Sequence, residues 1–308
     1  MSLFIGIDVG GTSIKGAVID GAGKLYAEDS VVTGSGEEIA GNVVILCKKL
    51  IAQVPEKPAG VGIGCAGVID SEHGTVVLAG NLKLKNYPLA KLVEKQINLP
   101  VKITNDANAA ALGEAKFGAG KEYRDSILVT LGTGVGGGVV IDGKLFEGNK
   151  SAGAEIGHMV IEFGGESCTC GRRGCFEAYS SATALIKRTK WAMEENPGSK
   201  MWESYTVETA SGKTAFEYAE KDIVASEVVE WYIKYLACGL VNIANIFRPQ
   251  VIMLGGGVSN QRERLTAPLQ TIMDREAFAS GYAPVKVTTA TLGNSAGSYG
   301  AAALLIED

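Results

Sequence analysis

The sequence predicts an α/β protein built from two similar lobes. Short apolar runs rich in β-branched residues alternate with segments of helical periodicity along its 308 residues, which is typical of this class. Nearly the same hexapeptide, GAVIDG and GVVIDG, occurs at residues 16–21 and 138–143, each time closing a hairpin that opens with a Gly/Thr turn. At this length a single core usually gives way to two domains. Two copies of one unit explain these observations economically, and a chance likeness between glycine-rich hairpins is the alternative.

The first half is predicted to hold a meander of strands, an amphipathic helix, two more strands and a second helix. Glycine-bounded apolar runs favour hairpin strands, and apolar residues spaced by three and four favour helices. Either Asn105 or Asp106 can cap the second helix. The predicted elements are strands at 3–9, 14–20 and 24–30, a helix at 37–54, strands at 59–67 and 101–105, and a helix that begins at Asn105 or Asp106.

The second half repeats the beginning of the first. Residues 126–146 again form strand, glycine turn, strand and turn. The later predicted elements are a helix at 222–247 stopped by Pro249, a strand at 251–257, a helix at 260–276, a strand at 285–292 and a helix at 295–306. We place the N-terminal lobe at residues 1–118 plus 294–308 and the C-terminal lobe at 119–293.

Composition and charge exclude several classes of protein. The chain is 46% hydrophobic and 20% charged, which is ample for folded cores. Its formal net charge of −5 leaves no basic surplus to neutralise the phosphates of a nucleic acid or an anionic membrane. No apolar stretch reaches the length of a membrane span, and the first residues enter a strand without a leader pattern. We therefore expect a cytoplasmic protein with a small-molecule substrate, and neither nucleic acid nor membrane as a partner.

Two segments, 62–67 and 132–137, match the GxGxxG pattern of dinucleotide-binding folds. That fingerprint requires a helix to begin inside the motif, so that the pyrophosphate meets the helix N-terminus. Strand and turn sequences follow both segments here, which disfavours a nicotinamide dehydrogenase. Residues 138–145 also approach the Walker pattern, but Leu145 stands where a Ser or Thr must reach Mg²⁺.

Glycine supplies 41 of the 308 residues, and three glycine-rich turns follow predicted strands. Successive backbone N–H groups in such turns form concave anion sites, although a single one is more often a plain hairpin. The turns are Asp8-Val9-Gly10-Gly11-Thr12, Leu131-Gly132-Thr133-Gly134 and Leu254-Gly255-Gly256-Gly257-Val258. Two related turns at the start of two related lobes resemble the phosphate loops of the actin, Hsp70 and sugar kinase superfamily. That resemblance implies ATP in a cleft between duplicated lobes.

Three of the six cysteines lie within eight positions, at Cys168, Cys170 and Cys175, and His158 precedes them. Three thiolates and one imidazole complete a tetrahedral zinc shell, and a closed shell of four protein ligands is structural. Free or redox-active cysteines are the alternative. The other cysteines, Cys47, Cys65 and Cys238, lie on apolar segments and are expected in cores.

The segments Glu155-Ile156-Gly157-His158, CTCGRRGC at 168–175 and Phe176-Glu177, together with the Asp8 turn, resemble the ROK family of bacterial sugar kinases and repressors. The resemblance runs from about residue 4 to the C-terminus. It implies two lobes of the actin-like ATPase (ribonuclease H-like) type with the active site in the cleft between them. A ROK repressor carries a helix-turn-helix domain before the first phosphate loop, and Asp8 comes too early for one, so the kinase branch is favoured.

The resemblance assigns the residues of the site. Asp106 is the expected catalytic base, and phosphoryl transfer does need a carboxylate to orient and deprotonate the attacking hydroxyl. Without the resemblance, a helix cap is the simpler role for Asp106. Asn81 has flanks that depart from the common pattern, and Lys15 is either a phosphate contact or a solvated strand lysine. The implied sugar contacts are Asn81, Asn105, Asp106, Glu155, His158 and Glu177; the implied contacts of ATP and Mg²⁺ are Asp8, Gly10, Gly11, Thr12, Lys15, Gly132, Thr133, Gly134, Gly255, Gly256 and Gly257; the implied zinc ligands are His158, Cys168, Cys170 and Cys175.

The implied reaction is ATP-dependent phosphorylation of a hexose at its 6-hydroxyl, with glucose as the first choice. An N-acetylmannosamine or N-acetylglucosamine kinase is the alternative within the class, because the same residues suit those sugars. A sugar-responsive regulator without catalysis is the alternative from another class. The implied cofactors are ATP, Mg²⁺ and structural Zn²⁺, and a homodimer is an expectation of the resemblance alone.

Overall fold

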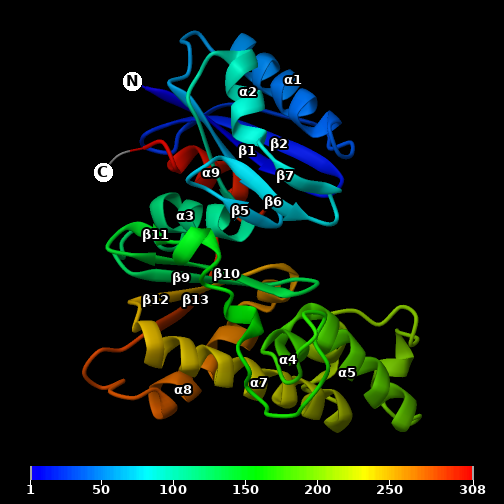
Figure 1. Cartoon of the computed structure of the whole chain (residues 1–308). Coiled ribbons are helices and arrows are strands. Elements are labelled where there is room, and N and C mark those ends of the chain that lie inside the picture. Colours follow the sequence, from blue (N-terminus) through cyan, green and yellow to red (C-terminus); the bar gives the residue numbers. More distant parts are fainter. Residues whose placement is uncertain (1, 307–308) are drawn as a thin grey trace. The chain divides into compact units, whose positions relative to one another are not determined.

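The computed structural model describes residues 2–306 and contains two five-stranded sheets with equivalent strand orders (Figure 1). The first sheet has the order β3 (Leu25–Val32), β2 (Ser13–Asp20), β1 (Leu3–Val9), β4 (Gly60–Cys65) and β8 (Val101–Asn105). The second has the order β11 (Lys144–Phe146), β10 (Val135–Ile141), β9 (Ser126–Leu131), β12 (Val251–Gly255) and β13 (Lys286–Thr289). Each sheet thus begins with a meander and continues with two later strands. This topology confirms the repeat expected from the two hexapeptides, which span the ends of β2 and β10 and the turns after them.

The pairing directions also agree between the sheets. In the first, β2 is antiparallel to β3, and β4 is parallel to β8. In the second, β10 is antiparallel to β11 and β12 is parallel to β13. The GxGxxG segments lead into strands, since β5 (Val68–Asp70) follows the first and β10 begins within the second. The dinucleotide fingerprint is therefore ruled out by the local structure.

The two faces of the first sheet are covered by different helices. Gly6 pairs with Ala17, and Ile7 pairs with Gly16, so Gly6 and Gly16 lie on opposite faces. A methyl group added at Gly6 would lie 1.7 Å from the carbonyl oxygen of Ser298 in α9 (Ala296–Ala303), whereas one added at Gly16 would lie 2.7 Å from a methyl of Leu50 in α1 (Glu38–Ala52). Helices α9 and α3 (Asp106–Phe117) pack against each other, and α1 packs against α2 (Leu89–Ile97). Figure 1 shows these two pairs on either side of the sheet.

The remaining elements elaborate both halves of the chain. A small sheet of β5, β6 (Thr75–Ala79) and β7 (Leu84–Tyr87) is inserted between β4 and α2. The second half contains the long helix α7 (Ile223–Phe247), which agrees with the helix expected at 222–247 and is capped by Asp222. The other helices of that half are α4 (Glu177–Ser180), α5 (Ala182–Glu195), α6 (Thr214–Tyr218) and α8 (Glu263–Glu276).

Three late elements are shorter than expected. The strand expected at 285–292 spans only Lys286–Thr289, and the helix expected at 295–306 spans Ala296–Ala303. The helix expected at 260–276 begins at Glu263, after a 3₁₀ turn at Gly257–Gln261. Beyond the end of the strand, the N–H of Thr291 donates to the carboxylate of Glu114 and not to a neighbouring strand.

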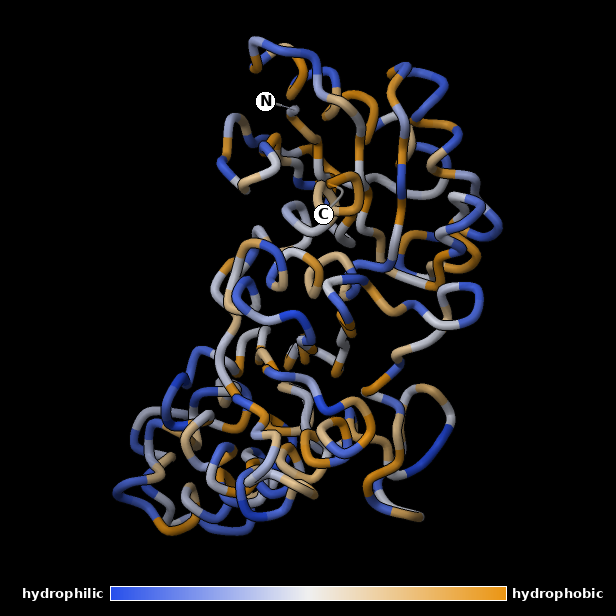
Figure 2. The backbone as a smooth tube through the Cα atoms, turned by 90° about the vertical axis from the view of Figure 1, so that its left-hand side faces the viewer, coloured by the Kyte–Doolittle hydropathy of each residue, from blue (hydrophilic) through white to orange (hydrophobic). Residues whose placement is uncertain are grey.

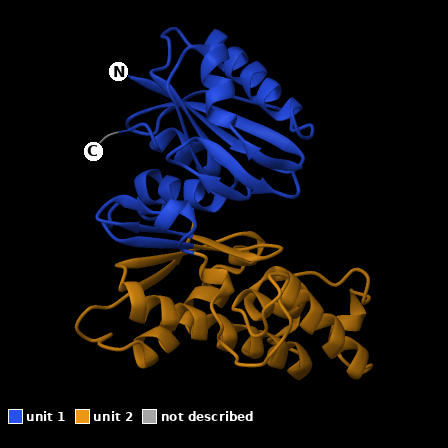
Figure 3. Ribbon diagram, viewed as in Figure 1, with its two compact units in different colours: residues 1–128, 138–154, 291–308 blue, residues 129–137, 155–290 orange. Residues whose placement is uncertain are grey.

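The chain separates into two compact units (Figure 3). Unit 1 comprises residues 1–128, 138–154 and 291–308, and unit 2 comprises residues 129–137 and 155–290. The division passes through strands β9 and β10, whereas the predicted lobes keep the second sheet whole. The lobe boundaries at 118/119 and 293/294 remain a prediction.

Hydrophobic residues occur in short stretches along the backbone, interrupted by hydrophilic ones (Figure 2). Among residues 2–306, no helix has both the length and the apolar composition needed to cross a bilayer.

Two helical glycines should respond in opposite ways to substitution by alanine. Gly41→Ala in α1 should raise the free energy of unfolding by roughly 0.5–1 kcal/mol, because alanine loses less backbone entropy and nothing lies within 4 Å of the added methyl. Gly113→Ala in α3 should lower it by roughly 1–3 kcal/mol through overpacking, because its methyl would lie 2.4 Å from the carbonyl oxygen of Ala296. Urea unfolding measures both, and a Gly113→Ala protein as stable as the wild type would contradict this close packing of α3 on α9.

Candidate functional site

The first glycine turn follows β1 and is fixed by Thr33. The Thr33 hydroxyl donates to the carbonyl of Gly10 at 2.7 Å, and its backbone N–H donates to the carbonyl of Thr12 at 3.2 Å. Gly11 and Thr12 are exposed at the tip of the turn. Asn81 is also exposed, in the turn between β6 and β7, and its side-chain nitrogen lies 3.9 Å from where a Cβ of Gly11 would be. A predicted sugar contact and a predicted phosphate contact therefore lie next to each other within unit 1.

Asp8 lies in β1, directly across from Lys15 on β2. Burial raises the pKa of the Asp8 carboxyl, and the negative charge of Asp106 raises it further, while Lys15 lowers it. The carboxylate lies against the first turn of α9, where a side chain at Gly297 would lie 2.8 Å from the Asp8 Cγ. Asp8 and Asp106 thus form a local concentration of negative charge that suits a cation. Lys15 itself is exposed, which leaves both of its expected roles open.

Asp8 should make stability depend on pH in a defined direction. A carboxyl whose pKa is raised on folding makes its full stabilising contribution at pH values below 3.8, its ordinary pKa. That contribution is lost as the pH rises through the raised pKa of the folded state. Ionised Asp8 therefore costs stability at neutral pH in the protein without ligands. We expect Asp8→Asn to raise the melting temperature at neutral pH, with a gain that shrinks as the pH falls toward 3.8. Calorimetry across this pH range measures the gain, and one that grew on acidification would contradict the assignment.

Asp106 is the first residue of α3, but it is not the cap of that helix. Asn105 is the cap, because its side-chain oxygen accepts from the N–H groups of Ala107 at 2.8 Å and Asn108 at 3.3 Å. The Asn105 amide also donates to the carbonyl of Gly67 at 3.0 Å. The structure thus gives the capping role to Asn105. Oδ1 of Asp106 accepts from the N–H of Ala107, and the other carboxylate oxygen, Oδ2, takes no part in that bond. Its direct contact with a sugar remains a prediction, as does that of Asn105.

In unit 2, Glu177 connects the second glycine turn to the cysteine loop. One oxygen of its carboxylate accepts from the N–H of Val135 at 3.0 Å, at a place where a side chain on Gly134 would lie only 2.2 Å away. The other oxygen accepts from the hydroxyl of Thr169 at 3.2 Å and from the thiol of Cys168 at 3.5 Å. The resemblance assigned Glu177 only to the sugar, so this bridging role was missed. No spacing in the sequence could have indicated it, since 42 positions separate Glu177 from Val135.

The third glycine turn lies beside the second. Gly256 has a φ of +82°, and a Cβ on it would lie 2.5 Å from the carbonyl oxygen of Leu131. Only glycine fits this backbone conformation and this distance without strain. The second turn is also held by α5, since the N–H of Ala182 donates to the carbonyl of Gly132 and the hydroxyl of Thr183 donates to that of Thr133. Gly132, Thr133 and Gly134 thus adjoin Gly255, Gly256 and Gly257, which brings two predicted nucleotide contacts together.

His158, Cys168, Cys170 and Cys175 have their ligand atoms within 4.8 Å of one another. The Cys170 and Cys175 sulfurs are 3.6 Å apart, and the Cys168 sulfur is 3.7 Å from Nδ1 of His158. Tetrahedral zinc with sulfur at about 2.3 Å and nitrogen at about 2.0–2.1 Å requires separations of roughly 3.8 Å and 3.5–3.6 Å. The donor set therefore fits a structural zinc ion, with Nδ1 of His158 facing the cysteines.

The pKa values of the thiols depend on how deeply each cysteine is buried and on its hydrogen bonds. A backbone N–H of Arg172 lowers the pKa of Cys170. Burial raises the pKa of Cys175 to about 12, and the pKa values of Cys47 and Cys65 are raised to about 12 by burial as well. Cys47 and Cys65 are buried in the apolar core of the first lobe, as expected. A bound cation would favour the thiolates of Cys168, Cys170 and Cys175, which lie in the cluster, and not those of Cys47 and Cys65.

Glu155 is exposed and precedes the 3₁₀ turn η2 (Ile156–His158), which carries His158. This turn lies close to β10, since a methyl on Gly157 would lie 1.9 Å from the carbonyl oxygen of Val135. Val135 therefore adjoins both η2 and Glu177. The structure brings Glu177 and His158 to one place in unit 2, and the sugar contacts assigned to them remain predictions.

Comparison with known proteins identifies the family. Residues 4–308 match the ROK family. The chain belongs to the ROK family. It is 35% identical to a glucokinase of Streptomyces coelicolor, over 100% of this chain and 98% of that protein. It is 32% identical to a xylose repressor of Caldicellulosiruptor bescii, over 99% of this chain and 78% of that protein.

Solved ROK structures confirm the expected fold. The structure of a ROK family glucokinase from Streptomyces griseus in complex with glucose and AMPPNP superposes with a TM-score of 0.80 at 35% identity. The superposition covers 98% of this chain and 99% of that one. The two-lobed α/β architecture of this ROK chain is therefore established along its length.

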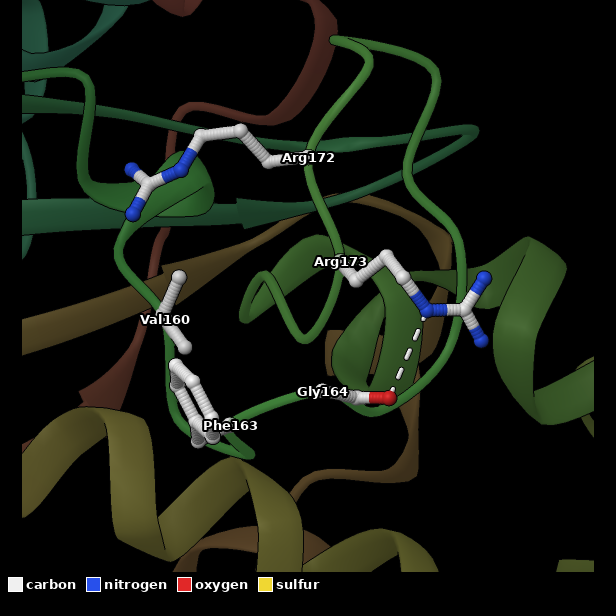
Figure 4. Close-up of a pocket in the computed structure, with 5 residues that line it drawn as sticks. All are labelled: Val160, Phe163, Gly164, Arg172 and Arg173. Carbon is white, nitrogen blue, oxygen red and sulfur yellow. Dashed lines mark hydrogen bonds between the residues drawn. The ribbon is translucent and has the colours of Figure 1, made fainter.

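A surface pocket adjoins the cysteine loop of this ROK chain (Figure 4). Arg173 donates to the carbonyl of Gly164 at 3.4 Å, and Arg172 donates to the carbonyl of His158 at 3.3 Å. Val160 and the fully exposed Phe163 complete the lining. None of the residues expected to contact sugar or nucleotide lines this pocket, and its two arginines instead brace the cysteine loop.

Proposed function

We propose that this ROK protein is an ATP-dependent hexose kinase that phosphorylates glucose at its 6-hydroxyl. The observation that carries the proposal is full-length likeness to glucokinases, one of them solved with glucose and AMPPNP. The position of Asp106 at the start of α3, with the capping role taken by Asn105, supports it. A carboxylate not needed as a cap is available to accept a proton.

Asp106 orients the 6-hydroxyl and accepts its proton as the phosphoryl group is transferred. Asn81, Asn105, Glu155, His158 and Glu177 hydrogen-bond the other hydroxyls, and each hydroxyl missing from a competitor would leave a buried polar group unpaired. The backbones of the turns at Gly10, Gly132 and Gly256 hold the nucleotide. Mg²⁺ beside Asp8 would supply charge neutralisation for the phosphates.

The four-ligand cluster orders the segment that carries the sugar contacts. His158 is both a cluster member and, through Nε2, a sugar contact, while Glu177 touches Cys168 and Thr169 of the loop. Structural zinc would therefore fix Glu155, His158 and Glu177 in one geometry, although it lies outside the reaction itself.

A coupled assay of ADP release tests the reaction. Glucose, mannose, fructose, allose, N-acetylglucosamine and N-acetylmannosamine are compared, and we expect glucose to have the highest kcat/KM. A higher value for an N-acetyl sugar would transfer the assignment to that substrate. Turnover on none of the six would refute the kinase.

A sugar-responsive regulator is the second candidate, because the likeness to a xylose repressor covers 99% of this chain. Such a protein binds sugar without turnover. The same assay would then show no ADP release, while titration calorimetry would still show sugar binding. We also propose a homodimer that binds no nucleic acid, consistent with the net charge of −5. Sedimentation velocity, with and without duplex DNA, tests both points.

A further inference from the structure

Glu114 is a fully buried carboxylate that the reaction does not use. It lies in α3, the helix that begins with Asp106. Oε1 accepts from the N–H groups of Thr291 at 2.9 Å and Leu292 at 2.6 Å. Oε2 accepts from the N–H of Ala119 at 2.9 Å and from the Thr291 hydroxyl at 3.3 Å. We call this set of four bonds the Glu114 clasp.

The clasp joins two segments that are far apart in the sequence. Ala119 belongs to the turn in which the chain leaves α3, and residues 291–292 lead into α9. A Cβ on Gly118 would lie 2.0 Å from Oε2, so the carboxylate occupies space that any other residue there would fill. The backbone on both sides is thus shaped around this one side chain.

The clasp lies where the chain re-enters unit 1. The N–H of Ala290, the last residue of unit 2, donates to the carbonyl of Leu254 at 2.8 Å within that unit. The N–H of the next residue, Thr291, donates to Glu114 within unit 1. The clasp itself joins parts of unit 1 alone, namely α3, the turn at Ala119 and the segment that leads into α9.

We propose that Glu114 is a positioning residue for the phosphoryl transfer, an inference that rests on the proposed kinase function. By fixing residues 291 and 292, it joins α3, which begins with Asp106, to α9, whose first turn lies against the Asp8 carboxylate. Burying a carboxylate is costly unless its oxygens are fully bonded, as they are here. Rigid geometry matters because a displacement of about 1 Å can cost roughly 100-fold in rate.

The first test is the kinetics of Glu114→Gln. Glutamine has nearly the same shape, but its NH₂ group would face backbone N–H donors, so one side of the clasp is lost. We expect kcat to fall by roughly tenfold or more while KM for glucose changes by less than about threefold, the split expected when only transition-state alignment is lost. The matched control is Glu122→Gln, an exposed carboxylate on the segment that follows α3, which should keep the wild-type kcat. A folded Glu114→Gln protein with wild-type kcat would show that Glu114 is merely structural and overturn the proposal.

The second test is hydrogen exchange, which needs no enzymatic turnover. The amides of Ala119, Thr291 and Leu292 lie outside helices and strands, yet the clasp should protect them in the wild type. Exchange as fast as that of exposed loop residues such as Glu56 and Lys57 would overturn the clasp even if Glu114→Gln failed to fold. A wild-type protein that phosphorylates no hexose would instead refute the proposed function, while the exchange rates still decide whether the clasp exists.

Discussion

Asp106→Ala should lower kcat for glucose by roughly 10²- to 10⁴-fold, the contribution expected of a positioned general base. The carboxylate is lost, while the Asn105 cap keeps α3 in place because its bonds to Ala107 and Asn108 do not involve Asp106. Glucose binding should persist, since Asp106 supplies one of several hydrogen bonds. Steady-state kinetics and titration calorimetry with glucose measure the two effects separately.

Glu94→Ala, an exposed carboxylate of α2, is the control and should keep wild-type kinetics. If Asp106→Ala retained kcat, the base would have to be another residue. If the wild type and Asp106→Ala bound sugar equally well and neither phosphorylated it, the protein would be the regulator and not the kinase.

Loss of a cluster cysteine should have the second large effect. Cys170→Ser removes an exposed ligand, so it disturbs packing less than a change at buried Cys175 would. We expect wild-type protein to carry one zinc ion per chain, and the variant to bind zinc at least roughly 100-fold more weakly, since even outer-shell changes cost 10- to 100-fold. Its kcat/KM should fall because Glu177 and His158 lose their fixed positions. Elemental analysis and kinetics on the same sample measure both quantities.

Cys238→Ser is the matched control, because Cys238 is half-buried and lies outside the cluster. It should retain zinc and activity. Wild-type protein without zinc, or Cys170→Ser with full zinc and reduced activity, would contradict the structural role of the cluster.

The repeat was predictable because glycine turns and apolar runs are local signals. The two meanders predicted from the sequence are present in the structure, as β1–β3 and β9–β11. Helix α7 begins after Asp222, whose side chain accepts from the N–H of Val224. Helix α2 was missed because it has nine residues and begins after Pro88 without a side-chain cap. Helix α5 was missed although Ser181 caps it through the N–H of Ala184, a signal that the sequence does contain.

The site was predictable in its composition but not in its contacts. The zinc ligands follow from spacing, and the structure brings all four together. The capping of α3 by Asn105 was one of two possibilities, and only coordinates could choose between them. The bonds of Glu177 to Val135 and of Glu114 to Thr291 join positions 42 and 177 residues apart, so no local pattern encodes them.

The covering of the first sheet by α9 has a consequence for the order in which the protein forms during synthesis. Ala302 of α9 closes an apolar cluster with Ala17 and Ile19 of β2, and Phe4, Phe117 and Tyr299 pack against it. Helix α3 covers part of this face, but the rest has no cover until residues 296–303 have left the ribosome. At about 5–20 residues per second, the interval between the end of α3 and the arrival of α9 is roughly 10–40 s. The first lobe to be translated is therefore the last to be completed, and a chain that ended before residue 291 would expose that face permanently.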